Sequence, residues 1–274
     1  MVECVIANTT VVPVRENPSE GAEQLTQLLF GEVCEVLDRL PRWTKIRSTL
    51  DGQEGWVDYK MVSLASSLIA SSPHRLEAVV AAPMAAATPM DGGADLLLTL
   101  GTRLPNYSHG TFEVLGQQYL IDPTCVSTAQ RSTGEADLQQ SDLQRSDLAT
   151  IAQSLLNAPY LWGGKNLMGM DCSGFTQVVY AAMGVNLLRN AREQMTQGEL
   201  VPSLADAQPG DLAFFDHADR DPKVTNISHV GLLLSPTEII HCSGCVHIDT
   251  IDEQGIHLPD GSLTHHLVQI KRYL

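Results

Sequence analysis

Three residues in the second half of the chain, Cys172, His229 and His241, have the side chains that nucleophilic catalysis by a thiol requires. A cysteine nucleophile needs a base that removes its proton, and the base needs a third group that fixes its tautomer and orientation. One cysteine and two histidines can fill these roles, which indicates a cysteine-dependent enzyme. The alternative is structural, because most cysteines are small buried thiols and a pair of histidines can lie in a core or on a surface.

The sequence around Cys172 predicts that this residue opens a helix. Asp171 stands where a helix N-cap belongs, Gly184 supplies a C-terminal stop, and apolar residues recur at helical spacing between them: Phe175, Val178, Val179 and Ala182. Backbone N–H groups are unpaired in the first turn of a helix, and the helix dipole favours negative charge there. We therefore expect a stabilised thiolate at Cys172, with a pKa below the free value of about 8.5.

The two histidines lie in neighbouring segments that predict strands. Residues 226–234 and 238–243 are rich in aliphatic side chains, and a short turn at Pro236 separates them. Adjacent antiparallel strands bring side chains of one face into contact. The pattern therefore predicts that His229 and His241 meet.

These segments resemble the NlpC-type cysteine peptidases of bacterial cell-wall turnover, a papain-like family. The matching motifs follow the family's order across most of residues 140–274: Tyr160-Leu161-Trp162-Gly163-Gly164, Asp171-Cys172-Ser173-Gly174-Phe175, Gln208-Pro209-Gly210-Asp211-Leu212-Ala213-Phe214-Phe215, Ser228-His229-Val230-Gly231 and Ile240-His241. The resemblance implies that Cys172 is the nucleophile, that His229 is the general base and that His241 orients the base. It implies no cofactor.

The resemblance also implies roles around the nucleophile. The oxyanion would be bound by the backbone N–H of Cys172, helped by the Tyr160 hydroxyl, and such donors are typically worth about 2.7–4 kcal/mol each. Trp162 would form a wall of the groove. The glycines that follow Trp162 would let the substrate backbone approach closely.

Members of this family with SH3-like domains ahead of the catalytic domain resemble endopeptidases that cut the bond between γ-D-glutamate and a diamino acid. Their first SH3-like domain closes the groove, so that they accept short peptides with a free N-terminal L-alanine. The expected substrate is therefore a murein tripeptide or tetrapeptide, or a peptidoglycan stem peptide. The positions that match the ammonium-binding residues are Glu23, Tyr59, Asp171 and Ser173.

One segment departs from the family pattern. After Leu188 the family has an arginine, an acidic residue and a hydroxyl residue, whereas this chain has Arg189, Asn190 and Ala191. Arg189 and Asn190 are therefore expected at the substrate site, with Asn190 as an uncharged hydrogen-bond acceptor. The strictness of the free-amine requirement stays open, as does the choice between meso-diaminopimelate and L-lysine.

The chain is expected to fold as a papain-like α+β catalytic domain preceded by two small SH3-like β-barrels. Short strand-like runs separated by turns indicate the barrels, and a helix capped by Asp142 or Asp147 is expected to begin the catalytic domain. The expected boundaries are residues 1–64 for the first SH3-like domain, 65–127 for a second, diverged copy, 128–141 for a linker and 142–274 for the peptidase domain.

Composition narrows the expected partners and compartment. The formal charge of −15 disfavours nucleic acid and anionic membranes as partners, because both require basic patches. The first residues lack the basic start and apolar core of a signal peptide, and the six cysteines leave an odd number once one is assigned to catalysis. A cytoplasmic protein is expected, or a periplasmic or secreted one if a signal has been removed.

A short cysteine- and histidine-rich segment could suggest zinc. Cys242 and Cys245, with His241 and His247, have the spacing of half a structural site, but a second such cysteine pair is absent from the sequence. We therefore expect no metal. Two other functions remain as alternatives: another papain-like amidase or acyltransferase acting on cell-wall material, and a wall-binding protein that uses only its SH3-like domains.

Overall fold

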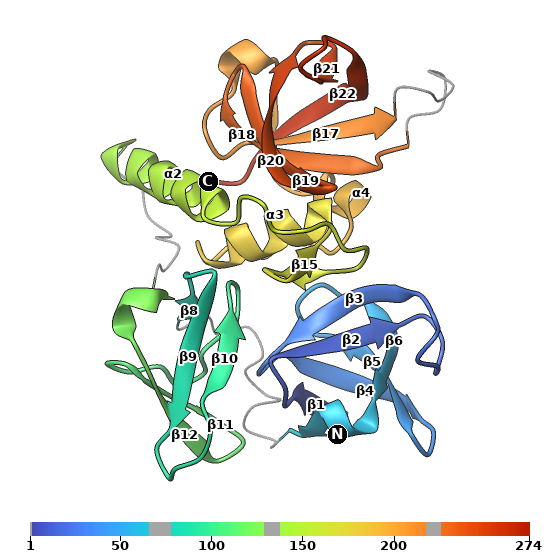
Figure 1. The fold of residues 1–274 in the computed structure, drawn as a ribbon, viewed down its shortest axis with the longest axis vertical. Coiled ribbons are helices and arrows are strands. Elements are labelled where there is room, and N and C mark those ends of the chain that lie inside the picture. The colour runs from blue at the N-terminus through green and yellow to red at the C-terminus, as the bar shows by residue number, and fades with distance from the viewer. Residues whose placement is uncertain (1, 66–77, 129–137, 218–225) are drawn as a thin grey trace.

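The computed structural model describes residues 2–65, 78–128, 138–217 and 226–274. Two small β-units lie side by side at one end of the molecule, and a mixed helix and sheet unit lies across both of them (Figure 1). Within the described residues, no helix has both the length and the apolar character needed to cross a membrane.

The first β-unit is a seven-stranded antiparallel sheet with the order β3-β2-β6-β5-β4-β1-β7. Side chains on alternate residues of its strands point inward, and Val12, Val14, Ile46 and Val57 are fully buried. Its elements are β1 (Cys4–Ala7), β2 (Val11–Arg15), β3 (Gln24–Leu29), β4 (Val33–Arg39), β5 (Trp43–Ser48), β6 (Glu54–Asp58), η1 (Tyr59–Met61) and β7 (Val62–Leu64).

The second β-unit contains a four-stranded sheet with the order β10-β9-β12-β11 and a separate β13-β8 pair. Its core is continuous with the first unit, because Ile6 and Phe30 of the first unit join the cluster that contains Leu98 and Phe112. Its elements are β8 (Val79–Val80), β9 (Met84–Pro89), β10 (Leu96–Thr99), β11 (Thr111–Val114), β12 (Gln117–Ile121), η2 (Pro123–Cys125) and β13 (Val126–Ser127).

The third unit is α+β, as the sequence predicts. Its sheet has the order β16-β22-β17-β18-β19-β20-β21, and an additional pairing of β21 with β22 closes it. Its elements are α2 (Leu138–Gln153), β14 (Lys165–Asn166), β15 (Gly169–Met170), α3 (Cys172–Ala181), α4 (Ala191–Gln194), β16 (Glu199–Val201), η3 (Leu204–Asp206), β17 (Leu212–His217), β18 (His229–Ser235), β19 (Glu238–Ser243), β20 (Cys245–Asp252), β21 (Gly255–His257) and β22 (Leu263–Arg272).

The start of helix α2 differs from the sequence prediction. Asp142 and Asp147 both lie inside α2, which includes residues 138–141 of the expected linker. The predicted cap was wrong because the polar residues before Leu148 were interpreted as a linker, although they continue the helix. The rest of that linker, residues 129–137, lies outside the described residues.

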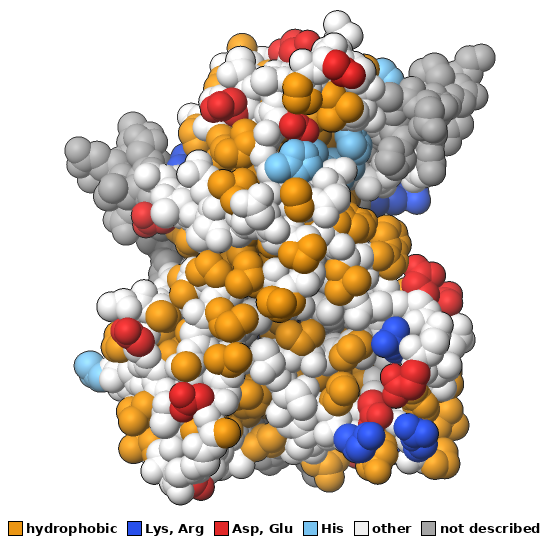
Figure 2. All heavy atoms as spheres, viewed as in Figure 1, with side chains coloured by type: hydrophobic (Ala, Val, Ile, Leu, Met, Phe, Trp, Pro, Cys, Tyr) orange, Lys and Arg blue, Asp and Glu red, His pale blue; other side chains and the backbone are white. Residues whose placement is uncertain are grey.

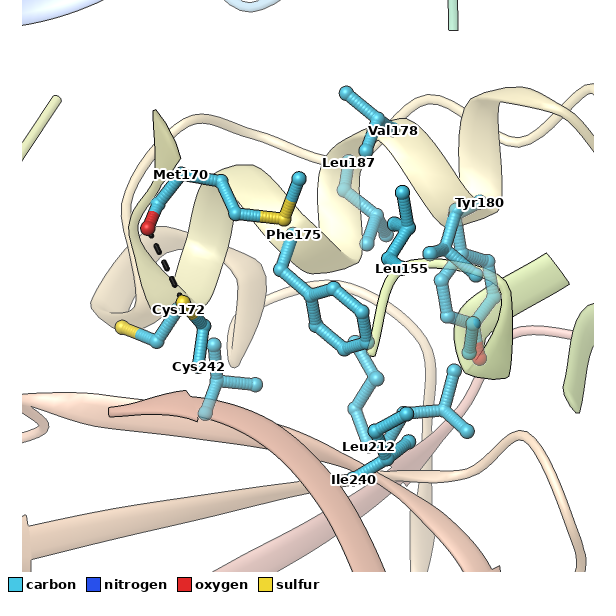
Figure 3. Close-up of a cluster of buried hydrophobic side chains, with 14 of the residues drawn as sticks. Leu155, Met170, Cys172, Phe175, Val178, Tyr180, Leu187, Leu212, Ile240 and Cys242 are labelled. Atoms are coloured by element: carbon cyan, nitrogen blue, oxygen red, sulfur yellow. Dashed lines mark hydrogen bonds between the residues drawn. The ribbon is translucent and has the colours of Figure 1, made fainter. Parts of the chain in front are cut away.

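Helix α3 lies on the sheet through an almost entirely apolar face (Figure 3). Phe175 and Val179 of the helix and Leu212 and Ile240 of the sheet are all fully buried in one cluster. The Asp171 carboxylate accepts a hydrogen bond of 2.7 Å from the Gly174 N–H. The predicted N-cap is therefore confirmed, and it sets the position at which the helix begins.

A buried ion pair joins the first β-unit to the third. Lys165 Nζ lies 2.8 and 3.1 Å from the two Glu32 carboxylate oxygens, and both side chains are less than 10% exposed. The Gln27 side-chain carbonyl also accepts hydrogen bonds from the Lys165 N–H and the Asn166 amide, at 3.0 and 2.8 Å. The two units therefore share a polar interface.

Removing one partner of this ion pair should destabilise the whole chain. Glu32→Gln leaves the Lys165 ammonium buried without its counter-charge, which typically costs about 3–5 kcal/mol. Urea unfolding should show a loss of that size, whereas Glu35→Gln should cost less than about 1 kcal/mol, because the Glu35–Arg47 pair is exposed. Equal effects of the two substitutions would contradict the structural role of the buried pair.

Candidate active site

The predicted nucleophile and base line one cavity of about 600 Å³. Cys172 lies at the start of α3, and His229 is the first residue of β18. Leu25 of the first β-unit lines the same cavity, so two units form its wall. Further lining residues from the third unit are Tyr160, Trp162, Asp171, Ser173, Asn190, Ala191, Arg192, Ile227, Ser228, Cys242, Ser243, Gly244 and His265.

The Cys172 thiol is more deeply buried than the sequence suggests. Burial raises its pKa to about 12, and the neighbouring Asp171 carboxylate adds to the rise. The N–H groups of Val230 and Ser173 hydrogen-bond the sulfur and act in the opposite direction. The prediction of a lowered pKa was wrong, because desolvation outweighs the stabilisation that a helix start gives to a thiolate. The thiol is therefore neutral here and needs a base.

Three side chains form a hydrogen-bonded chain that begins at His229 in the cavity wall. His229 Nε2 lies 2.8 Å from His241 Nδ1, and His241 Nε2 lies 3.1 Å from Asp249 Oδ2. Burial lowers the pKa of His241, so its ring is neutral and carries one proton. The hydrogen bond from His241 lowers the pKa of Asp249, which keeps its carboxylate ionised.

These protonation states fix both tautomers. The Asp249 carboxylate can only accept, so the single proton of His241 lies on Nε2 and its Nδ1 is an acceptor. His229 must then donate from Nε2, which leaves its Nδ1 without a proton. An unprotonated Nδ1 is what a base for the Cys172 thiol requires.

The predicted sequence motifs did not include Asp249. Its signal is strand alternation: His241 pairs with His247 across β19 and β20, and Asp249 follows His247 by two residues on the same face. This register cannot be read before the two strands are paired.

Asp171 and Ser173 lie in the cavity wall, but their polar atoms are already used. Arg189 Nη1 and Nη2 lie 3.0 and 2.6 Å from the two Asp171 oxygens, and Arg189 Nη1 also lies 2.9 Å from Ser173 Oγ. Arg189 is 1% exposed and does not line the cavity. Asn190 does line it, and its amide donates to Glu193 over 3.0 Å.

The first β-unit reaches the cavity through the start of β3. Glu23 Oε1 accepts a 2.7 Å hydrogen bond from the Trp162 indole, and the Gln24 amide donates to the Trp162 carbonyl over 3.1 Å. Gly163 has φ +72°, and a Cβ there would lie 2.5 Å from the Gln24 carbonyl oxygen, so only glycine fits this approach. Tyr59 is half exposed in η1 and does not line the cavity.

The Tyr160 hydroxyl has the properties of a hydrogen-bond donor in this cavity. Burial raises its pKa to about 12, so it keeps its proton. Cys172 is the first residue of α3, and the first N–H groups of a helix have no acceptor within the helix. Both predicted oxyanion donors therefore lie in the wall of one cavity.

Two family models match the chain. Residues 157–266 match the NlpC/P60 family, and residues 10–63 match the bacterial SH3 domain. The chain carries an NlpC/P60 domain. The bacterial SH3 match covers the first β-unit alone, so the second SH3-like copy stays a prediction.

Curated relatives and a solved structure agree with this assignment. The chain is 28% identical over 229 residues to a "Gamma-D-glutamyl-L-lysine dipeptidyl-peptidase" of Bacillus subtilis, covering 79% of this chain and 71% of that protein. It is 26% identical to a protein of the same name from Bacillus cereus, covering 79% of this chain and 66% of that protein. A crystal structure of an NlpC/P60 family protein from Bacillus cereus covers 99% of both chains, with a TM-score of 0.78 at 20% identity, and shows the shared fold.

Replacing Asp249 with asparagine should impair catalysis, because it disturbs which ring nitrogens of His241 and His229 carry the protons. An amide can donate to His241 as well as accept, so the tautomer of His241 is no longer fixed. We expect kcat to fall by about 10–100-fold, less than the 10²–10⁴-fold that a general base itself contributes, with KM nearly unchanged. The matched control is Asp252→Asn, because Asp252 is an exposed residue of the same strand that pairs with His257. If kcat of the two variants is the same, Asp249 does not act through His241.

Proposed function

We propose that this protein is a cysteine peptidase that hydrolyses the γ-D-glutamyl–diamino acid bond of peptidoglycan-derived peptides with a free N-terminal L-alanine. The observation that carries the proposal is the cavity: it contains the Cys172 thiol and His229, and the first β-unit forms part of its wall. The names of the relatives support the same bond. The alternative amidase and acyltransferase activities would use the same thiol on a different acyl group.

The proposed reaction begins with the neutral thiol. His229 Nδ1 takes the proton from Cys172 Sγ, and the thiolate attacks the carbonyl carbon of the scissile amide. The oxyanion that forms accepts hydrogen bonds from the Cys172 N–H and the Tyr160 hydroxyl. His229 then gives its proton to the leaving amine, the C–N bond breaks, and a thioester remains. A water molecule, deprotonated by His229, hydrolyses the thioester and restores the thiol.

His241 and Asp249 stabilise the charged form of the base. When His229 holds two protons, its Nε2–H donates to the neutral His241 ring over the 2.8 Å contact. Asp249 holds the opposite nitrogen of His241 and contributes a negative charge to the chain. In this proposal His229 is the general base, and His241 is a positioning residue that acts through it.

Substrate selection would come from the first β-unit. Leu25 and the Trp162 indole held by Glu23 limit the cavity on that side, so a peptide would have to end there. Among the described residues, Glu23 has no cation within 4.0 Å, whereas the charge of Asp171 is balanced by Arg189. Glu23 is exposed and does not itself line the cavity, but it accepts a hydrogen bond from Trp162, which does. An α-ammonium needs such an unbalanced carboxylate when it leaves water, so we assign its recognition to Glu23 beside the cavity. The structure gives no support for the predicted contact with Tyr59.

The reaction is tested with a pair of peptides. Mass spectrometry of products from L-Ala-γ-D-Glu-diaminopimelate should show free diaminopimelate and the intact L-Ala-D-Glu dipeptide, and Cys172→Ala should abolish both while the thermal melt stays nearly unchanged. Products cut at another bond would instead indicate an amidase of different specificity. Full activity of Cys172→Ala would overturn the assignment of the nucleophile.

Glu23→Gln tests recognition of the ammonium. Glutamine keeps a carbonyl oxygen that can accept from the Trp162 indole, so the substitution removes mainly the charge. A charge-assisted hydrogen bond is worth roughly 1.5–3 kcal/mol, which predicts a loss in kcat/KM of about tenfold to a hundredfold for the free peptide. The N-acetylated peptide has no ammonium and should be a poor substrate for both enzymes.

The control for this variant is Glu20→Gln, because Glu20 is an exposed residue of the preceding turn. It should leave kcat/KM unchanged for both peptides. The recognition hypothesis fails if wild-type enzyme cleaves the free and acetylated peptides equally well, or if Glu23→Gln leaves their ratio unchanged.

A further inference from the structure

A second cluster of ligand-type side chains lies behind the catalytic histidines. His241 Nε2 and His247 Nε2 each lie 3.1 Å from the same oxygen of Asp249, and the three ligand atoms lie within 4.8 Å of one another. His241 and His247 are directly paired across β19 and β20. On the face drawn in Figure 2, histidine side chains gather in the region where Figure 1 labels β19 and β20. Within the described residues this is the one group of this kind.

The protonation of His247 is the feature that needs an explanation. Its Nδ1 lies 2.8 Å from the Cys245 carbonyl oxygen, which can only accept, so the proton of the neutral ring lies on Nδ1. Its Nε2 then directs a lone pair at an oxygen of the Asp249 carboxylate, which is also only an acceptor. Two lone pairs repel at this distance, and either a second proton on His247 or a metal ion between the atoms removes the repulsion.

We propose that His241 Nε2, His247 Nε2 and the Asp249 carboxylate bind a divalent metal ion of the zinc class, and that the bound ion inhibits the enzyme. Imidazole and carboxylate ligands suit this class of ion, and three protein ligands leave a position for water. Tetrahedral zinc with ligands at about 2.0–2.1 Å holds them about 3.4 Å apart. The two 3.1 Å contacts would lengthen by a few tenths of an ångström, and the two Nε2 atoms, which lie within 4.8 Å of each other, would reach the same separation.

The surroundings of the three ligands fit this proposal. The hydrogen bond from His247 Nδ1 to a backbone carbonyl is the second contact that metal-bound histidines usually make. The His247 side chain is 33% exposed and gives an ion access from solvent, whereas His241 is 2% exposed. The proposed site does not include the cysteines that were considered as zinc ligands from the sequence. The Cys242 thiol donates a hydrogen bond to the Met170 carbonyl inside the core (Figure 3).

Inhibition follows from the tautomers and therefore depends on the proposed function. Metal at His241 Nε2 displaces the proton from that atom, so the neutral ring carries its proton on Nδ1 instead. His229 Nε2 must then accept from His241, and the proton of His229 lies on Nδ1. The number of protons on the two rings is unchanged, but the atom that should take the Cys172 proton already holds one.

Binding is measured first, without reference to activity. Isothermal titration of Zn²⁺ into the Cys172→Ala protein, which lacks the active-site thiol, should show a site that depends on His247. His247→Ala in that background should weaken binding by at least about 10–100-fold, the loss that even outer partners of a metal cause. The control His257→Ala, at a partly buried histidine on β21 outside the cluster, should bind Zn²⁺ like the parent. Binding that is unaffected by His247→Ala overturns the proposal.

Inhibition is measured next with the free L-alanyl peptide. Each enzyme is compared with its own kcat in the presence of a chelator, and His247→Ala should need at least about tenfold more Zn²⁺ than wild type for half-inhibition. Equal sensitivity of the two enzymes would mean that Zn²⁺ acts at the thiol, which contradicts inhibition through His241. If the peptide is not a substrate at all, the binding measurement still decides the metal site, so failure of the proposed function is distinguished from failure of this inference.

Discussion

The buried guanidinium of Arg189 is the contact on which the rest of the site depends. It binds both oxygens of Asp171 at 3.0 and 2.6 Å, the Ser173 hydroxyl at 2.9 Å and the Thr26 hydroxyl at 2.7 Å. Asp171 caps the helix that begins with Cys172, and Thr26 belongs to the first β-unit. A buried charge that loses its partner is strongly destabilising, so Arg189 fixes Cys172 and the first β-unit in position relative to each other.

This link between the two units changes how the role of the first β-unit is interpreted. An SH3-like domain could be a tether that leaves catalysis alone, but here its strand β3 supplies Thr26 to the guanidinium, Gln27 to the Lys165 N–H and Leu25 to the cavity wall. The same strand therefore stabilises the start of α3 and limits the space in front of the thiol. The shape of the cavity and the stability of the chain cannot be varied independently at this interface.

Local sequence patterns were sufficient to predict part of the site. The cap at Asp171 and the side-chain contact between His229 and His241 follow from helix and strand periodicity, which act over a few residues. The pKa of Cys172 could not be predicted in the same way, because it depends on how much of the third unit covers the thiol. Asp249 was missed for a related reason: its contact with His241 depends on the register between two strands. The second SH3-like copy has no such local pattern and is still only a prediction.

The role proposed for Asp249 follows from the burial of the thiol. A thiolate formed at rest would need only a nearby cation, whereas a neutral thiol needs a base whose lone pair is on the correct nitrogen. In both His229 and His241 either ring nitrogen can carry the proton. The hydrogen bond between the two rings forms whichever ring is the donor. A group that can only accept a hydrogen bond from His241 Nε2 selects one of the two proton arrangements, and the Asp249 carboxylate is that group. In the proposed mechanism, the reactivity of a deeply buried sulfur therefore depends on a mostly buried carboxylate of β20, two histidines away.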